Sequence, residues 1–522
     1  METTYSRRNF IKDFSRFGGS AFLAMSALDL LGQDKGPTWL PKDLPKLTQS
    51  KKVIILGAGA AGLCTAYELT KLGYSCTVLE ARLRPGGRIW TVRRGTKETE
   101  MSGGSQTCEF EPGHYMNAGP ARIPQYHYTT LGYCREFNVP IEVFNNYNES
   151  AYVHNSKLGT KMRMREVRAD YEGYTAELLA KAISQDKLEA PFTAEDREKL
   201  LDYLRVSCGL DAKNNYGANP NRGYTEWPAA TGKPGVLSQP TPFEALLKTG
   251  LGAHLAFAKT HTQQPVMFQP VGGIDALPYA MAKQLNPLIT YGAEVTALRK
   301  TPQGKARVEY RVDGADKMLE ADYCICTLPA AVLANLPSDF SEDHKKAIGR
   351  IQYSALNKIG LQFKRRFWEE DDWIFGGMSW TDQTTRQIWY PNYGYLQKKG
   401  VIVGYYTGDL RSDDGAIHNI TGMTHEQRLE HALSTGEMIH PQYRREFENS
   451  FSVSWKALKY NLGATTHYET AEMRTEILKV IGEGDGPLYI AGEHASWITG
   501  WIAGAFESAL HTVKNLHQRA LA

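Results

Sequence analysis

The glycine-rich segment GAGAAG, residues 57–62, has the residue types and spacing that bind a dinucleotide. Gly57 permits a tight turn, Gly59 lets the backbone approach a pyrophosphate, and Gly62 allows close packing of a helix against a strand. The N-terminus of that helix supplies partial positive charge for the phosphates. Glu80 follows at the distance expected for an acceptor of ribose hydroxyl groups. NAD and FAD share this pattern, so it predicts a dinucleotide site without choosing between them.

The elements needed to position this site can be read around it. The apolar run VIIL at 53–56 predicts a buried parallel strand. Residues 60–72 predict a helix, and 76–79 predict a second strand that ends at Glu80. Together these segments form a βαβ unit.

The stretch EARLRPGGR at 80–88 resembles the E-A-x-x-R-x-G-G-R extension of the flavin amine oxidases. YIAGEH at 489–494 and GWIAGA at 500–505 resemble the other flavin-binding segment of that family. The resemblance implies FAD as cofactor. In the monoamine oxidases a cysteine near the C-terminus tethers the flavin, but the last cysteine here is Cys326, so we expect the FAD to be non-covalent.

The resemblance also implies which residues contact FAD. The acid at Glu493 is expected to bond the ribityl chain, and Arg88 offers a permanently charged donor. The implied contacts are Gly57, Gly59, Ala61, Gly62, Glu80, Ala81, Arg82, Gly87, Arg88, Ala121, Arg122, Val295, Glu493, Gly500, Trp501 and Ile502.

Within this family, NAGPARIP at 117–124 resembles the G-P-x-R-[LI]-P segment of the L-amino-acid oxidases. The resemblance implies that Arg122 holds the substrate carboxylate. A planar guanidinium can bind a carboxylate through two parallel charge-assisted hydrogen bonds. GVIVGY at 400–405 resembles the strand that carries the family's second carboxylate contact. That contact is therefore predicted to be Tyr405, with Tyr406 on the opposite face of the strand.

The same resemblance implies four further site residues. Lys358, in NKIGLQF, is expected to reach the flavin through a water molecule and to assist the reaction with oxygen. Gly500 is expected to offer a carbonyl to the substrate amine, and Trp501 to form a wall of the pocket. Ala464 is expected to border the substrate side chain.

The resemblance implies oxidative deamination of L-amino acids by O2 to 2-oxo acids, ammonia and hydrogen peroxide. Three alternatives stay open: an amino-acid 2-monooxygenase that decarboxylates to an amide, an amine or polyamine oxidase, and a non-catalytic flavoprotein scaffold. The catalytic residues are predicted to be Arg122, Lys358, Tyr405 and Trp501. Whether a base exists, at His254 or His261, also stays open.

The implied fold is α/β, with a Rossmann-like FAD-binding domain of the glutathione-reductase type interleaved with a mixed-sheet substrate domain and a helical domain. Strand-like segments at 359–363, 372–375, 387–390 and 401–407 predict an antiparallel second sheet. TAED at 193–196 predicts a helix N-cap. The predicted boundaries are 51–104, 274–345 and 481–522 for FAD binding, 105–160, 266–273 and 346–480 for the substrate domain, and 161–265 for the helical entrance domain.

The N-terminus has features of an export signal. SRRNFIK at 6–12 resembles the twin-arginine motif, and the apolar stretch 17–28 is too short to span a bilayer. We therefore expect a signal segment over 1–33, a linker over 34–50 and a periplasmic or extracellular protein without a stable membrane span.

Composition excludes some classes of protein. The net charge of +3 over 522 residues argues against nucleic-acid binding. The seven cysteines have neither zinc-site nor disulfide spacing, so no metal is expected. Many members of the resembled family are dimers, which implies a homodimer.

Overall fold

A computed structural model describes residues 44–185, 192–407 and 415–522. Residues Pro45–Ala522 form one compact unit. The predicted signal segment and most of the predicted linker lie outside the described residues. Within the described part, every helix is too short or too polar to cross a bilayer.

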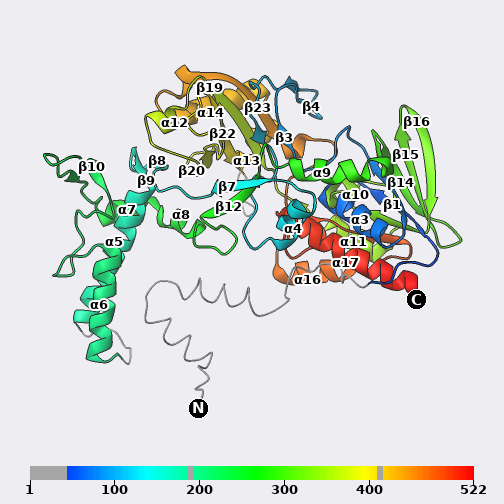
Figure 1. The fold of residues 1–522 in the computed structure, drawn as a ribbon, viewed down its shortest axis with the longest axis horizontal. Coiled ribbons are helices and arrows are strands. Elements are labelled where there is room, and N and C mark those ends of the chain that lie inside the picture. The colour runs from blue at the N-terminus through cyan, green and yellow to red at the C-terminus, as the bar shows by residue number, and fades with distance from the viewer. Residues whose placement is uncertain (1–43, 186–191, 408–414) are drawn as a thin grey trace, which may run out of the picture. The chain divides into compact units, whose positions relative to one another are not determined.

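A five-stranded parallel sheet lies next to the glycine-rich segment 57–62 (Figure 1). Its order is β13 (Ile289–Tyr291), β2 (Ser75–Glu80), β1 (Lys52–Leu56), β17 (Tyr323–Cys326) and β25 (Leu488–Ile490). Helix α3 (Ala60–Lys71) connects β1 to β2, which confirms the predicted βαβ unit. Strands from three distant parts of the chain therefore build one sheet.

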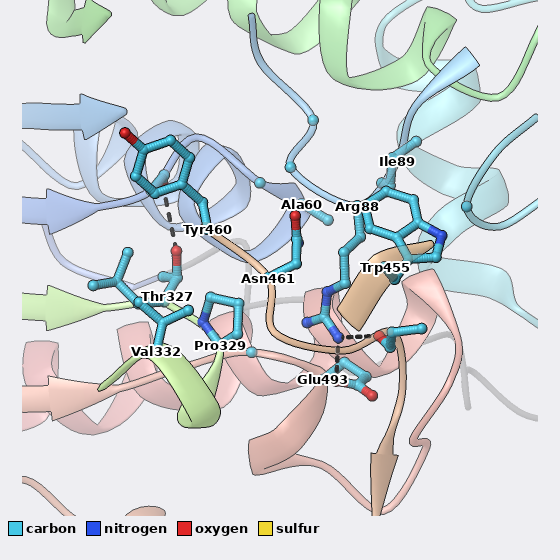
Figure 2. Close-up of a pocket in the computed structure, with 18 of the residues that line it drawn as sticks. Ala60, Arg88, Ile89, Thr327, Pro329, Val332, Trp455, Tyr460, Asn461 and Glu493 are labelled. Carbon is cyan, nitrogen blue, oxygen red and sulfur yellow. Dashed lines mark hydrogen bonds and ion pairs between the residues drawn. The ribbon is translucent and has the colours of Figure 1, made fainter. Parts of the chain in front are cut away.

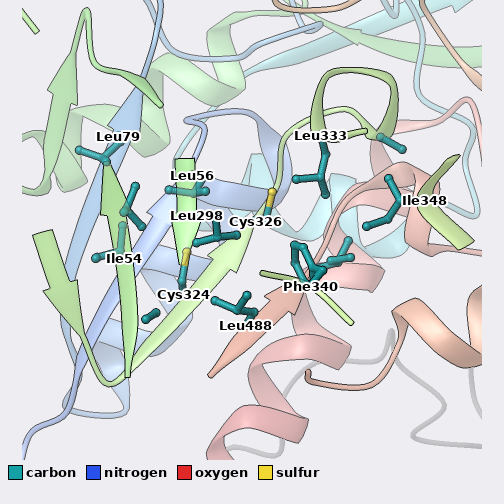
Figure 3. Close-up of a cluster of buried hydrophobic side chains, with 14 of the residues drawn as sticks. Ile54, Leu56, Leu79, Leu298, Cys324, Cys326, Leu333, Phe340, Ile348 and Leu488 are labelled. Carbon is teal, nitrogen blue, oxygen red and sulfur yellow. The ribbon is translucent and has the colours of Figure 1, made fainter. Parts of the chain in front are cut away.

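The two faces of this sheet are covered differently. On one face α3 packs against β1 and against the C-terminal helix α17 (Ile502–Leu521). The other face contributes to an apolar core that includes Ile54, Leu298 and Phe340 (Figure 3). This core joins the sheet to the antiparallel meander β14 (Glu294–Lys300), β15 (Ala306–Val312) and β16 (Ala315–Ala321), and to α10 (Ala330–Leu333), α11 (Glu342–Gly349) and α16 (Ala471–Ile481).

The second large sheet is mixed and has seven strands. Its order is β23 (Phe447–Ser454), β19 (Asn357–Phe363), β22 (Gly400–Thr407), β21 (Gln387–Trp389), β20 (Met378–Thr381), β8 (Tyr152–Asn155) and β9 (Thr160–Arg163). The strand predicted at 372–375 is wrong, because β20 begins only at Met378. Trp373, Gly376 and Gly377 have φ values of 58°, 70° and 76°, which extended strands do not accommodate.

The described part of the predicted helical segment contains four helices: α5 (Met164–Ser184), α6 (Ala194–Cys208), α7 (Phe243–Thr249) and α8 (Gly252–Phe257). The predicted N-cap of α6 is confirmed, since the Thr193 hydroxyl accepts a hydrogen bond from the Asp196 amide. A short hairpin, β10 (Tyr224–Glu226) and β11 (Val236–Leu237), interrupts the irregular chain between α6 and α7.

The remaining elements in chain order are β3 (Thr91–Val92), β4 (Lys97–Thr99), β5 (Ser105–Thr107), β6 (Met116–Asn117), α4 (Tyr128–Glu136), β7 (Ile141–Asn145), β12 (Val266–Pro270), α9 (Ala276–Leu285), η2 (Asn286–Leu288), β18 (Gln352–Tyr353), α12 (Phe367–Glu370), α13 (Gly415–Gly422), α14 (His425–Glu437), α15 (Tyr443–Glu446), η3 (Trp455–Ala457), β24 (Thr466–His467) and η4 (Glu493–Ala495).

The folded body begins earlier than the sequence predicted. The Leu47 amide donates to the Leu72 carbonyl at 3.1 Å. Nε2 of the buried His517 lies 2.9 Å from the Pro45 carbonyl. The last residues of the predicted linker are therefore bonded to the body, because their backbone groups find partners on α17 and after α3.

Candidate active site

A cavity of about 460 Å³ runs between the parallel sheet and the mixed sheet (Figure 2). The turn between β1 and α3 borders one part of it, and the N-terminus of α17 borders another. Lys358, Tyr406 and Trp501 also line it, so the glycine turn and the predicted substrate site share one cavity.

The glycine turn has the shape that a pyrophosphate requires. Gly57 has φ +99°, and a Cβ on Gly62 would lie 1.9 Å from the Gly57 carbonyl oxygen. A Cβ on Gly59 would meet nothing within 4 Å, so the backbone is bare on the cavity side. Glu80 accepts hydrogen bonds from the Ala58 and Arg82 amides, both at 2.8 Å, which hold its carboxylate at the cavity.

The buried Glu493 and the partly buried Arg88 form an ion pair at the same cavity, drawn in Figure 2. Nη1 of Arg88 lies 3.1 Å from Glu493 Oε2 and 2.6 Å from the Ala464 carbonyl. Thr466 donates to the same carboxylate from its amide and its hydroxyl. Burial raises the pKa of Glu493, but Arg88 and Thr466 outweigh that effect and hold it below its usual range. Glu493 is therefore a carboxylate and an acceptor.

Most of the predicted cofactor contacts line the cavity, and three do not. Gly62 packs against the Gly57 backbone, as the tight turn requires. Ala121 lies in an apolar cluster with Met267 and Trp389. Arg122 lies beside Trp389, as described below. The predicted residues that line the cavity are Gly57, Gly59, Ala61, Glu80, Ala81, Arg82, Gly87, Arg88, Val295, Glu493, Gly500, Trp501 and Ile502.

The cavity fits FAD. Two helix N-termini, a glycine turn and two oriented carboxylates meet in it, which suits a ligand with phosphates and ribose hydroxyl groups. The residues that the structure places around the cavity include no cysteine, in agreement with non-covalent binding.

Lys358 lies in the middle of β19 with 1% of its surface exposed. Its Nζ donates to the carbonyls of Asn117 and Gly119, at 3.0 and 2.5 Å. Burial, reinforced by the nearby charge of Arg122, lowers the pKa of Lys358 to about 7. The neutral amine needs two N–H groups for these carbonyls and keeps a free lone pair.

Arg122 is buried without a carboxylate partner among the described residues. Its Nη2 donates to Gln263 Oε1 at 3.0 Å, whereas Nε and Nη1 have no partner in the described part of the chain. The guanidinium lies 4.5 Å from the Trp389 ring centroid and 6.0 Å from that of Phe257. Burial lowers the pKa of Arg122 to about 10, so it keeps its charge at neutral pH.

The structure contradicts the predicted position of Tyr405, because its neighbour Tyr406 lines the cavity instead. Tyr405 is fully buried in the apolar core behind the mixed sheet, whereas Tyr406 lines the cavity. The two tyrosines do point to opposite faces, as predicted. The register explains the exchange: Lys358 pairs with Tyr406 across β19 and β22, so both side chains share one face. A bulge at Gly404, which has no Cα partner between Val403 and Tyr405, shifts the alternation.

Sequence reasoning missed several neighbours of Arg122. Trp389 stood inside a predicted strand, but its place over Arg122 depends on pairing between β21 and β22. Gln263 comes from the helical segment, and no motif marks it. His127 lies 5.0 Å from the Trp501 ring; burial and His261 lower its pKa to about 4, so it is neutral.

The remaining predicted site residues lie as follows. Gly500, Trp501 and Ala464 line the cavity. The His261 ring packs 4.4 Å from that of Tyr126. The side chain of His254 lies outside the described residues.

The fold resembles those of known amine oxidases. A putrescine oxidase variant covers 90% of this chain and 99% of its own, with a TM-score of 0.60 and 18% identity. Cyclohexylamine oxidase from Brevibacterium oxydans IH-35A covers 91% of this chain and 100% of its own, with a TM-score of 0.60 and 13% identity.

Sequence comparison gives relatives of similar length. YobN of Bacillus subtilis (strain 168), provisionally assigned as an L-amino-acid oxidase, is 28% identical and covers 90% of this chain and 95% of its own. The L-amino-acid oxidase of Demansia vestigiata is 26% identical, and the match covers 91% of this chain and 88% of that protein. The family model for flavin-containing amine oxidoreductases matches residues 60–517. The chain therefore belongs to the flavin-containing amine oxidoreductases and is an FAD-dependent enzyme.

Proposed function

We propose that this enzyme oxidises L-amino acids, and that Arg122 binds the substrate carboxylate. The observation that carries the proposal is the surroundings of Arg122: two of its guanidinium nitrogens are buried without partners among the described residues. Burying an unpaired charge costs several kcal/mol, of order 3–5 when a partner is missing. A substrate carboxylate supplies that partner by accepting a hydrogen bond from one of these two nitrogens.

The neighbouring side chains favour the same substrate class. Tyr406 lies close enough to Arg122 that each affects the other's pKa, and its hydroxyl is available as a second donor to the carboxylate. Lys358 adds positive charge when protonated and a proton acceptor when neutral. An amine without a carboxylate would leave Arg122 unpaired and is expected to bind poorly.

The reaction conserves atoms and electrons. The glycine turn, Glu80 and Glu493 would hold FAD, which when bound would supply the acceptor for a hydride from the α-carbon and the route of two electrons to O2, with hydrogen peroxide as product. The substrate loses one proton and becomes an imino acid, which water hydrolyses to a 2-oxo acid and ammonia. Arg122 and Tyr406 orient the substrate, and this positioning can contribute up to about 7–11 kcal/mol in favourable cases. The names of the curated relatives support this proposal over an amine substrate.

The test compares amino acids with their decarboxylated amines. Peroxide is measured for the L-amino acids and the matching amines, in wild type, Arg122→Lys and Arg122→Met. We expect Arg122→Met to lose at least about tenfold in kcat/KM for amino acids, about 1.4 kcal/mol, with little change for amines. The kcat/KM of Arg122→Lys for amino acids should lie between those of wild type and Arg122→Met, because lysine keeps the positive charge but lacks the planar pair of donors of a guanidinium.

Two results would overturn the proposal. Equal wild-type turnover of amines and amino acids would make the protein an amine oxidase. Formation of carbon dioxide and an amide, instead of ammonia and a 2-oxo acid, would make it a 2-monooxygenase.

We also propose export by the twin-arginine route, supported by the residues at 6–12. Replacing Arg7 and Arg8 together by lysine should keep the protein in the cytoplasm, as followed by cell fractionation. A homodimer stays a prediction, which light scattering of the purified protein tests.

A further inference from the structure

Residues 459–462, which we call the clasp, form a short loop at the cofactor cavity. The clasp consists of Lys459, Tyr460, Asn461 and Leu462, and all four residues line the cavity. Figure 2 shows Tyr460 and Asn461 projecting from this loop among the other lining residues. The loop comes from the chain that builds the mixed sheet and reaches the parallel sheet.

Glu294 anchors the first half of the clasp. Nζ of Lys459 lies 2.7 Å from Glu294 Oε1, and the Tyr460 hydroxyl donates to Oε2 at 3.0 Å. Glu294 is the first residue of β14 and directly precedes Val295, which also lines the cavity.

Arg82 anchors the second half. Its Nη2 donates to Asn461 Oδ1, and its guanidinium lies 5.2 Å from the Tyr460 ring centroid. Arg82 follows Glu80 by two residues, and an acid at the end of the second strand marks the adenosine ribose in this fold. Both anchors therefore place the clasp at the adenosine end of the cavity.

The backbone of the clasp is held in an unfavourable shape. Leu462 has φ +53°, in the left-handed region that residues other than glycine rarely adopt. Such a conformation persists only where the surroundings impose it, and it is concentrated at ligand clamps. Here the Leu462 amide donates to the Leu458 carbonyl at 3.1 Å and the Gly463 amide to the Trp455 carbonyl at 3.2 Å, which hold the end of the clasp.

We propose that the clasp retains FAD by covering its adenosine half, with Tyr460 and Asn461 as the contacts and Glu294 as the catch that keeps the loop closed. An aromatic ring stacks on flat bases, and an amide offers both a donor and an acceptor. Release of FAD then requires the contacts to Glu294 to open. The inference rests on the family's cofactor and not on the proposed substrate, so either can fail alone.

The experiment measures FAD release from diluted holoenzyme by the rise in flavin fluorescence. Glu294→Gln keeps the shape and removes the ion pair, and we expect release to be about threefold faster, as for an exposed pair. Tyr460→Leu removes the ring and should accelerate release about tenfold or more. The matched control is Lys248→Met, which breaks the Lys248–Glu244 pair on α7 and should release FAD at the wild-type rate.

Measurements at high salt and with added FAD distinguish a role of Glu294 in retaining FAD from a general role in stabilising the fold. About 1 M salt shortens the Debye length to about 3 Å and should accelerate release from wild type more than from Glu294→Gln. Activity lost on dilution should return when FAD is added. Wild-type release rates in both variants would overturn the proposal. So would a loss of secondary structure by circular dichroism in step with the loss of FAD, because the loop would then only support the fold.

Discussion

Tyr405 and Tyr406 are adjacent in β22, but their hydroxyl groups lie in different surroundings. The Tyr406 side chain lines the cavity close to Arg122, whereas the Tyr405 hydroxyl is buried without a partner in the described residues. We expect Tyr406→Phe to lower kcat/KM for L-amino acids about tenfold, since a charge-assisted hydrogen bond contributes about 1.5–3 kcal/mol. Steady-state kinetics by peroxide release measures this effect.

Tyr405→Phe is the matched control at the neighbouring position. It removes an unsatisfied buried hydroxyl, so we expect unchanged kcat/KM and equal or higher stability, by up to about 1 kcal/mol. If Tyr405→Phe lost activity and Tyr406→Phe kept it, the register described for β22 would be wrong.

Lys358 predicts a pH dependence with a definite sign. Its pKa is about 7 in the free protein because of burial and of Arg122, so the neutral amine, with its free lone pair, forms as pH rises through 7. We expect kcat/KM to rise over that range. A substrate carboxylate offsets the charge of Arg122, so the apparent pKa in kcat should lie higher than that in kcat/KM.

The same group links stability to pH. The ordinary pKa of lysine is 10.5, so between about 7 and 10.5 the unfolded chain binds more protons than the folded one. This lysine therefore makes the fold more stable as pH rises through that window. Lys358→Met should remove the rise of kcat/KM near pH 7. It should also remove the contribution of Lys358 to the rise in unfolding free energy between about pH 7 and 10.5. If kcat/KM of Lys358→Met still rose near pH 7, the titrating group would be another one, and the substrate amine would be the first candidate.

Among the elements, the turn between β1 and α3 offers a sharp pair of substitutions. A Cβ on Gly62 would lie 1.9 Å from a backbone oxygen, so Gly62→Ala should break the turn and destabilise the fold. A Cβ on Gly59 meets no protein atom within 4 Å, so Gly59→Ala should fold normally and lose FAD affinity by at least about tenfold. Circular dichroism and FAD titration measure the two effects. Equal FAD affinity in Gly59→Ala and wild type would contradict close contact with the cofactor there.

Elements defined by local signals could be predicted from the sequence. The glycine turn, Glu80 and the N-cap at Thr193 all appear in the structure. Each depends on residues within a few positions of one another, or on a motif whose spacing is fixed by one turn.

Features that depend on pairing between distant strands could not be predicted. The exchange of Tyr405 for Tyr406 results from a bulge at Gly404, which shows only once β22 pairs with β19. A shift by one residue moves every later side chain to the other face of a sheet. Gln263 likewise reaches Arg122 only through tertiary packing of the helical segment, 141 residues away in the chain.

At the scale of the whole molecule, residues 45–51 lie beside the C-terminal helix α17. The Pro45 carbonyl lies 2.9 Å from His517 Nε2, and Nζ of Lys51 donates to the Ala520 carbonyl at 3.1 Å. These contacts join residues more than 460 positions apart, so residues 45–51 are part of the fold although they precede the first strand.

This arrangement predicts how far the chain can be shortened. A protein that starts at Pro45 should keep the thermal midpoint of the full chain. One that starts at Lys52 leaves the fully buried His517 without its Nε2 partner, at a cost of about 1–3 kcal/mol, and should melt a few degrees lower. Both are compared at the same saturating FAD, because bound cofactor raises the midpoint by mass action.

His517→Gln should destabilise the chain from Pro45 more than the chain from Lys52, because the contact with Pro45 exists only in the first. Equal effects in the two backgrounds would show that residues 45–51 do not stabilise the fold through α17.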